Sequence, residues 1–318
     1  MSEEGDSVVP DGVADGALAL ELYAAAVVAT RRCYAALAQA NPPMAELEHV
    51  AACVARSASN PALAITVALA AAARDDAALA VQSACLAVRV ARRASTREQD
   101  LTGMALAALL VDSGRVRLAT ASAIDLDVFS ELPDSLNHLA PAATAALAVG
   151  GERSPLREAA ALTAFEVAWL ERPRLGALYQ GEHEPRLSSR VLLACRALLM
   201  RTAPRTYDAE LSPFDALREL ASKPGADTVA VRLLADAIGY VPVGTVVELA
   251  SGAWGVAGPQ PAAEPGRPVL FGLVDARGAI PGRPSELDER EIVRVITPKR
   301  AHFNPAFPLV AARSPAAK

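Results

Sequence analysis

The sequence predicts a mainly α-helical fold followed by a small antiparallel β unit. Hydrophobic residues make up 52% of the 318 residues but aromatic residues only 4%. The core must therefore be built from alanine, leucine and valine, and alanine is the strongest helix former. Apolar residues recur at helical spacing as far as residue 238, and short β-branched segments separated by glycine turns follow.

The helices are expected to begin at capping residues. Asn60 can cap a helix that has Pro61 at its first position. Thr96 and Gln99 are spaced as a capping box at the start of another helix. Up to the end of the central region, the expected helices are residues 17–40, 44–57, 61–73, 76–93, 96–111, 133–148, 155–171 and 187–202.

Two more helices and the sheet are expected after residue 211. Ser212 can cap a helix over 212–220, with Pro213 at its first position. A helix over 226–238 should end at Gly239 in a left-handed conformation. The alternating segments then predict four strands, at residues 243–249, 253–257, 268–274 and 291–296.

This pattern divides the chain into five parts. Residues 1–16 are polar and aperiodic, which predicts a disordered tail, and 17–75 form an N-terminal helical region. A helical core is expected over 76–222, and a helix with the small sheet over 223–298. The proline-rich residues 299–318 are expected to be irregular.

Charge and composition argue against several classes of partner. The net charge is -5 and no long basic run occurs, so we expect no binding to nucleic acid. The longest apolar stretch, residues 61–73, is too short to cross a bilayer. The N-terminus lacks the pattern of a secretory signal, so a cytoplasmic protein without membrane contact is expected. The four cysteines form no CxxC pair and are interpreted as buried apolar residues in a reducing compartment.

Two stretches of the sequence carry a resemblance to a known family. The run Leu106–Arg115 reads LAALLVDSGR and is similar to an LAALLHDIGK helix end. The runs Ser212–Leu220 and Pro242–Gly252 are similar to SPFEALREL and YPPGTLVELSDG, in the same order. These motifs resemble the HD-GYP family, bacterial cyclic-di-GMP phosphodiesterases of the HD superfamily. The resemblance covers roughly residues 20–298 and implies an HD-domain-like helical core with a small C-terminal sheet.

The resemblance also assigns the positions of the family's metal ligands, which are histidines and aspartates. It implies that an aspartate survives as Asp112, a histidine as His138, and that Arg115 stands in place of a lysine. Apolar residues replace the family's other histidines, and an arginine replaces its last aspartate, at Leu79, Val111, Val167, Ala168 and Arg196.

These replacements predict that metal-dependent hydrolysis is lost. Leu79 and Val111 donate no electrons to a metal, and Arg196 places a permanent cation where a dication would bind. The resemblance therefore implies no catalytic residue, no metal and no cofactor. Because both positions face the same metals in the family, we expect Arg196 to form an ion pair with Asp112.

The leading hypothesis is a non-catalytic HD-GYP-like pseudoenzyme that acts as a signalling or scaffolding protein in bacterial second-messenger regulation. It would work through protein partners, and the N-terminal helices could form a homodimer. One alternative is a metal-independent cyclic-di-GMP receptor in which Arg115 and Arg196 hold a phosphate. Another is an active phosphodiesterase with displaced ligands such as Asp112, His138 and His183; a lone histidine otherwise has a packing or hydrogen-bonding role.

Overall fold

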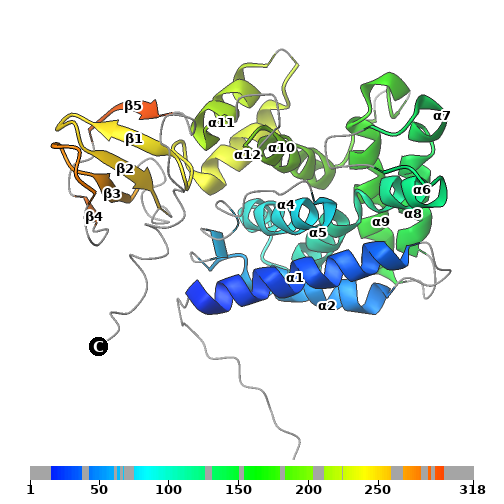
Figure 1. The fold of residues 1–318 in the computed structure, drawn as a ribbon. Helices are drawn as coiled ribbons and strands as arrows, with labels where there is room; N and C mark the ends of the chain where they lie inside the picture. Colours follow the sequence, from blue (N-terminus) through cyan, green and yellow to red (C-terminus); the bar gives the residue numbers. More distant parts are fainter. Residues whose placement is uncertain are drawn as a thin grey trace, which may run out of the picture.

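The structure is a computed structural model in which a helical body is followed by a small sheet (Figure 1). It describes residues 16–37, 43–60, 63–64, 67, 75–125, 131–149, 154–179, 183–202, 211–223, 225–258, 268–280, 286–287 and 291–296. Most of the helix predicted over 61–73 lies outside these residues, as do residues 1–15 and the tail 299–318. The predicted fold class, mainly α with a small antiparallel β unit, is confirmed.

The helical body contains most of the secondary structure that the sequence predicts. Element boundaries agree with the expected ones to within a few residues, apart from the region between 111 and 149. The helices are α1 (Gly16–Ala36), α2 (Met44–Ser57), α4 (Asp76–Ala91), α5 (Glu98–Leu110), α6 (Ser113–Ala121), α7 (Asp134–Asn137), α8 (Ala140–Val149), α9 (Pro155–Leu170), α10 (Leu187–Thr202), α11 (Pro213–Ser222) and α12 (Thr228–Ile238), with a 3-10 turn, η1, at Pro173–Leu175.

Side-chain caps start several of these helices. The Oγ atom of Ser212 accepts a hydrogen bond of 3.0 Å from the amide of Asp215, as the sequence predicts for α11. The capping box expected at Thr96 is wrong, because α5 begins at Glu98 and its N-cap, Arg97, makes no side-chain cap. Ser95 supports this helix start instead, since its hydroxyl accepts from the amide of Arg97 and bonds Asp100.

The single helix expected over 133–148 is in fact two, α7 and α8. The chain leaves the helical path at His138 and Leu139. Pro141 explains the break, because it has no amide proton to donate to the preceding turn, whereas a proline is tolerated near the start of a new helix. A further helix, α6, was not predicted; Asp112 is its N-cap and Ser113-Gly114 its first two residues.

The long hydrophobic helix α5 lies at the centre of the helical body. It packs against α4, α2 and α9, and α10 covers α4 on the side away from α1 (Figure 1). Its residues from Ala105 to Leu110 are buried almost completely. The C-terminal end of α5 therefore lies inside the body, although the helix starts at exposed residues, and the residues that follow Leu110 are also buried.

The C-terminal sheet has five strands in the order β4-β3-β2-β1-β5, with every neighbouring pair antiparallel. The strands are β1 (Val246–Leu249), β2 (Trp254–Ala257), β3 (Leu270–Val274), β4 (Glu286–Leu287) and β5 (Ile292–Ile296). The short strand β4 was not predicted. Gly239 ends α12 as predicted, but the left-handed conformation expected there is wrong. Its φ of 84° and ψ of 163° belong to an extended region that essentially only glycine occupies.

The sheet has hydrophobic clusters of its own. One cluster is formed by Val243, Val246, Val256, Leu273 and Ile296, and the other by Val247, Leu249, Ala257 and Leu270. Consecutive strand residues point to opposite faces, so both faces of the sheet are covered. Helix α12, which was predicted to belong with the sheet in the part 223–298, instead buries Leu234 and Ile238 in the core of the helical body.

The four cysteines differ in burial. Cys33, Cys85 and Cys195 are buried, but Cys53 is only half-buried, so the expectation that all four cysteines are buried is wrong for one of them. Cys53 lies on the accessible side of α2, beside His49 and Arg56. Within the described part of the chain, no helix is long and apolar enough to cross a membrane.

Candidate functional site

The candidate site is built around the short connection between α5 and α6. Asp112 lies in this connection, and its carbonyl oxygen accepts the first hydrogen bond of α6, from the amide of Val116. The side chain of Asp112 is 8% exposed, which places a carboxylate inside the helical body. A charge at such a depth needs paired charges and hydrogen bonds, and several segments supply them.

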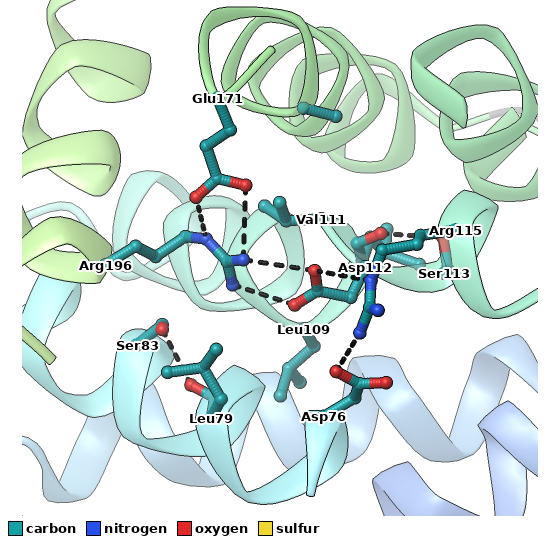
Figure 2. Close-up of polar contacts among 12 residues, drawn as sticks. Asp76, Leu79, Ser83, Leu109, Val111, Asp112, Ser113, Arg115, Glu171 and Arg196 are labelled. Atoms are coloured by element: carbon teal, nitrogen blue, oxygen red, sulfur yellow. Dashed lines mark hydrogen bonds and ion pairs between the residues drawn. The ribbon is translucent and has the colours of Figure 1, made fainter. Parts of the chain in front are cut away.

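The predicted ion pair between Asp112 and Arg196 is confirmed. Arg196 lies on α10, and its Nη1 and Nη2 atoms donate to the two carboxylate oxygens of Asp112 at 2.9 and 3.1 Å. The same guanidinium also donates to Glu171, at the end of α9, from Nε at 2.6 Å and from Nη2 at 3.2 Å. The Arg196 side chain is 4% exposed, so a buried guanidinium bridges two carboxylates (Figure 2).

A second guanidinium extends this arrangement. Arg115, one turn after Asp112, donates to Asp76 in the first turn of α4, and its Nε atom lies 3.8 Å from Asp112. Figure 2 shows the resulting series of alternating charges, from Glu171 through Arg196, Asp112 and Arg115 to Asp76. We call these five residues the charge chain. Helices α4, α6 and α10, with the end of α9, meet through it.

Burial and pairing oppose one another in the pKa values of the charge chain. Burial raises the pKa of Asp112, but the guanidinium groups of Arg196 and Arg115 outweigh burial and hold it below its usual value. For Asp76, burial and the nearby negative charge of Asp112 outweigh Arg115 and raise the pKa to about 6. Burial lowers the pKa of Arg196, but Asp112 and Glu171 more than compensate, so the pKa lies above its usual value.

The positions at which the resemblance predicts lost metal ligands are buried and apolar. Leu79 and Val111 are 1% and 2% exposed, and Val167 and Ala168 are fully buried. Leu79 and Val111 lie beside Asp112 and Arg196 in Figure 2. These hydrocarbon side chains offer no lone pair to a metal.

Neither His138 nor His183 is part of the charge chain. His138 is exposed beyond the end of α7, and its Nδ1 atom lies 3.3 Å from the carbonyl oxygen of Asp134 in the same turn. His183 is also exposed. Arg115 and Arg196, which the receptor hypothesis assigns to a phosphate, are both engaged by carboxylates of the protein.

Sequence reasoning missed Glu171 and Asp76 as members of the charge chain. Glu171 follows Val167 by four residues and Asp76 precedes Leu79 by three, so each lies on the same helix face as an assigned position. That spacing is the signal that could have found them. The resemblance points to the missing metal ligands, whereas Glu171 and Asp76 are the ion-pair partners of the two buried arginines.

A pocket opens beside the charge chain, with a volume of about 330 Å³. Four arginines and three carboxylates line it, so its charged side chains carry an excess of one positive charge. The lining residues are Asp112, Arg115, Glu131, Leu132, Asn137, Glu171, Arg172, Pro173, Arg174, Leu193, Arg196, Ala197 and Met200. The pocket thus joins the connection before α7, the η1 turn and the outer part of α10.

A second buried carboxylate lies on α9. Glu166 is 1% exposed and accepts hydrogen bonds from the hydroxyl groups of Tyr179 and Ser189 and from the amide of Arg186. The bond to Glu166 and burial raise the pKa of Tyr179. Three donors satisfy this carboxylate, which ties the segment after η1 to α9 and α10.

These observations limit the chemistry of the site. A guanidinium stays protonated at physiological pH, and here it already neutralises the carboxylates that a metal would need. The residues present therefore do not fit the metal centre that the resemblance would otherwise imply. Asp112 is likewise engaged by two cations, so it is not available as a general base. Across the described residues, no group of three or more His, Cys, Asp and Glu side chains could hold a metal ion.

Comparisons with known proteins found no relative of this chain. No protein-family model, no curated protein and no solved structure matches the chain.

Proposed function

We propose that this chain is a non-catalytic HD-GYP-like pseudoenzyme that acts as a signalling or scaffolding protein in bacterial second-messenger regulation. The observation that carries the proposal is the buried guanidinium of Arg196, which bridges Asp112 and Glu171. In this interpretation an internal cation has taken over the role of a bound metal, which is to neutralise inward-facing carboxylates and hold helices together. A domain altered in this way keeps its shape for binding but not its hydrolytic chemistry.

The apolar positions around the charge chain support the same proposal. A metal-dependent hydrolase lowers the pKa of a bound water and clamps a phosphate between metal ions. Leu79, Val111 and Val167 can take no part in either step, and their complete burial gives them a packing role. Loss of several ligands together with gain of a fixed cation favours a stable scaffold over a weakened enzyme.

The proposal is tested by restoring the assigned ligands. We expect the purified protein to contain less than about 0.1 iron, manganese or zinc ion per chain by elemental mass spectrometry. A variant combining Leu79→His, Val111→His, Val167→His, Ala168→His and Arg196→Asp should bind metal and be stabilised by it, because its buried carboxylates would lack their cation.

Arg196→Asp alone is the control, since it removes the cation without adding histidines. Two metal ions per chain in the unaltered protein would overturn the pseudoenzyme proposal and lead to a phosphodiesterase assay. If the variant with all five substitutions bound no more metal than Arg196→Asp, the resemblance to the HD-GYP family would lose its support.

Protein contacts are the expected mode of action of such a scaffold, and α1 offers a surface for them. Leu20 and Val28 on this helix are 57% and 47% exposed. A homodimer through the N-terminal helices would cover them, and sedimentation of the full chain over a range of concentrations would detect it. Substitution of both residues by glutamate should then favour the monomer.

A metal-independent receptor is the second candidate, because the pocket beside the charge chain is lined by four arginines. The receptor hypothesis assigned phosphate binding to Arg115 and Arg196, but carboxylates of the protein already pair with both. A receptor would therefore have to use the other two arginines.

A further inference from the structure

We propose that the pocket binds a small phosphate-bearing anion through Arg172 and Arg174. The inference deepens the receptor alternative given above. It needs only the pocket and its charges, so it holds whether or not the chain is related to HD-GYP proteins. It also moves the binding role away from Arg115 and Arg196.

Arg172 is the main cation of the proposed site. It lines the pocket and is half-buried, and within the described residues no carboxylate forms an ion pair with it. Its Nε atom donates to the side-chain oxygen of Asn137 at 2.7 Å, and its Nη1 atom donates to the carbonyl oxygen of Ala168. These neutral partners fix the orientation of the guanidinium and supply no negative charge. A guanidinium has five N–H donors, so others remain for a ligand.

The two carboxylates that attract Arg172 have another cation as their hydrogen-bond partner. Glu171 and Asp112 attract it, but both are held by the guanidinium of Arg196. Burial lowers the pKa of Arg172, and the attraction of Glu171 and Asp112 offsets this only in part. An anion in the pocket would supply that counter-ion.

Arg174 supplies a second, adjustable cation at the pocket. Its ion pair with Asp134 joins two highly exposed side chains, 71% and 79% exposed. Exposed pairs of this kind contribute only about 0–1 kcal/mol, so Arg174 can leave Asp134 to bind a ligand at little cost. Arg172 and Arg174 are separated by Pro173 on the η1 turn, whose restricted φ limits the freedom of the backbone between them.

The size and chemistry of the pocket indicate the class of ligand. Small-molecule pockets usually have volumes of roughly 300–1,000 Å³, and this pocket has about 330 Å³. It therefore suits one small molecule. Arginine matches the geometry of phosphate oxygens with paired N–H donors, and two guanidinium groups match the charge of a phosphate dianion.

The test is thermal unfolding of the full chain titrated with inorganic phosphate. The buffer contains EDTA, so bound metal cannot mediate the effect, and sodium chloride keeps the ionic strength equal. At ten times its dissociation constant, phosphate should raise the Tm by roughly 3 °C. Acetate at the same concentration should raise it by less than a third of that amount.

Three variants separate the pocket from general charge effects. Arg172→Gln should weaken phosphate binding at least tenfold, and Arg174→Gln should weaken it about threefold. Arg117→Gln is the matched control, because Arg117 is an exposed arginine on α6 that does not line the pocket. Circular dichroism without phosphate establishes that each variant is folded, and Arg174→Gln still tests the site if Arg172→Gln does not fold.

An unchanged phosphate response in both pocket variants would overturn the proposal, as would equal stabilisation by acetate and phosphate or no stabilisation of the unaltered chain. The proposed function has a different readout, namely metal content. Either proposal can therefore fail while the other stands.

Discussion

A buried arginine between two carboxylates is stable only while all of its partners are present. Arg196 gives four hydrogen bonds to Asp112 and Glu171, and these compensate for its separation from water. Removing one partner of such a pair leaves an uncompensated charge in a medium of low polarity, whereas replacing both can be nearly neutral. Asp112 and Arg196 thus form an energetic unit.

The first prediction concerns this unit. Arg196→Met and Asp112→Asn should each reduce the free energy of unfolding by about 3–5 kcal/mol at pH 7. The double variant should lose about 1–3 kcal/mol less than the sum of the two single losses. Urea unfolding of all four proteins gives the coupling energy. Arg174→Met, in an exposed ion pair, is the control and should change stability by less than about 1 kcal/mol. Additive losses would show that the buried pair is not coupled.

The second prediction concerns pH and Asp76, whose pKa rises to about 6 in the folded protein from an ordinary 3.8. A carboxyl group with a raised folded pKa binds more protons in the folded state, so its contribution to stability falls as pH rises from about 4 to 6 and is constant above that range. Asp112, with a lowered pKa, contributes in the opposite direction. Asp76→Asn removes the first contribution.

We therefore expect the free energy of unfolding of Asp76→Asn, relative to the unaltered chain, to increase by about 2 kcal/mol between pH 4 and pH 7. Urea unfolding of both proteins at these two pH values measures the change. Asp134→Asn is a suitable control, because Asp134 lies in an exposed pair. A relative stability that did not change with pH would show that Asp76 titrates normally.

At the scale of elements, the contact between α6 and α8 depends on a single glycine. The amide of Gly114 donates to the hydroxyl of Thr144, and that hydroxyl donates to the carbonyl oxygen of Val111. A Cβ atom at residue 114 would lie 2.2 Å from the carbonyl oxygen of Ala140 and 2.5 Å from the amide of Thr144. Only glycine lets the backbones of these helices approach so closely.

The third prediction follows from that contact. Gly114→Ala should destabilise the protein by about 1–3 kcal/mol or more, because backbone atoms must move to admit the methyl group. The usual effect of Gly→Ala in a helix is the opposite, a gain of about 0.5–1 kcal/mol. Gly103→Ala in α5 is the matched control, since its nearest new contact is a side-chain carbon of Leu156 at 3.5 Å. Equal Tm values for the two variants would contradict the close packing.

Which elements could be predicted depends on whether local or distant contacts determine them. Ser212 and Asp215 define the start of α11 through neighbours in the sequence, and that helix was predicted correctly. Thr96 has an equally suitable spacing, but Ser95 bonds Asp100 and the helix begins two residues later. The start of α6 was missed because a glycine that is typical of a turn is used for packing against α8.

The residues of the candidate site could also be predicted only in part. The resemblance placed Asp112 and Arg196 together, since it supplied a distance that the sequence alone lacks. It also suggested His138, which lies outside the site because Pro141 divides the predicted helix and leaves the histidine exposed. Glu171 and Arg172 were missed as site residues because their roles arise from α9, α10 and α7 meeting in space.

At the scale of the whole molecule, the helical body and the sheet have separate cores. Most buried apolar residues of the body form one large cluster that ends with Ile238 on α12, and a small one lies around Leu132. The two clusters of the sheet contain only residues from 241 onward. The sheet lies at one end of the molecule, and α6 to α9 lie at the other (Figure 1). Small clusters provide less stabilisation from apolar burial than a large one, so the two units should differ in stability.

The two tryptophans of the chain report on these units separately. Trp169 lies on α9 and donates to the carbonyl oxygen of Gly176, and Trp254 lies on β2 against the cluster around Val256. The fourth prediction is that urea unfolding followed by fluorescence in Trp169→Phe, which retains Trp254, has a lower midpoint than in Trp254→Phe. The unfolding transition measured by circular dichroism at 222 nm should coincide with the Trp169 transition, because the helices belong to the body.

Substitutions of a buried leucine by alanine, one in the sheet and one in the body, complete this test. Leu249→Ala in β1 and Leu106→Ala in α5 remove buried side chains, and each should cost about 2–5 kcal/mol in its own unit. Leu249→Ala should shift the Trp254 transition and leave the Trp169 transition in place, because the sheet can unfold while the body remains folded. Leu106→Ala should lower the Trp169 midpoint. If both substitutions moved both transitions equally, the sheet and the body would be one cooperative unit, and a ligand in the pocket would then stabilise the sheet as much as the helices.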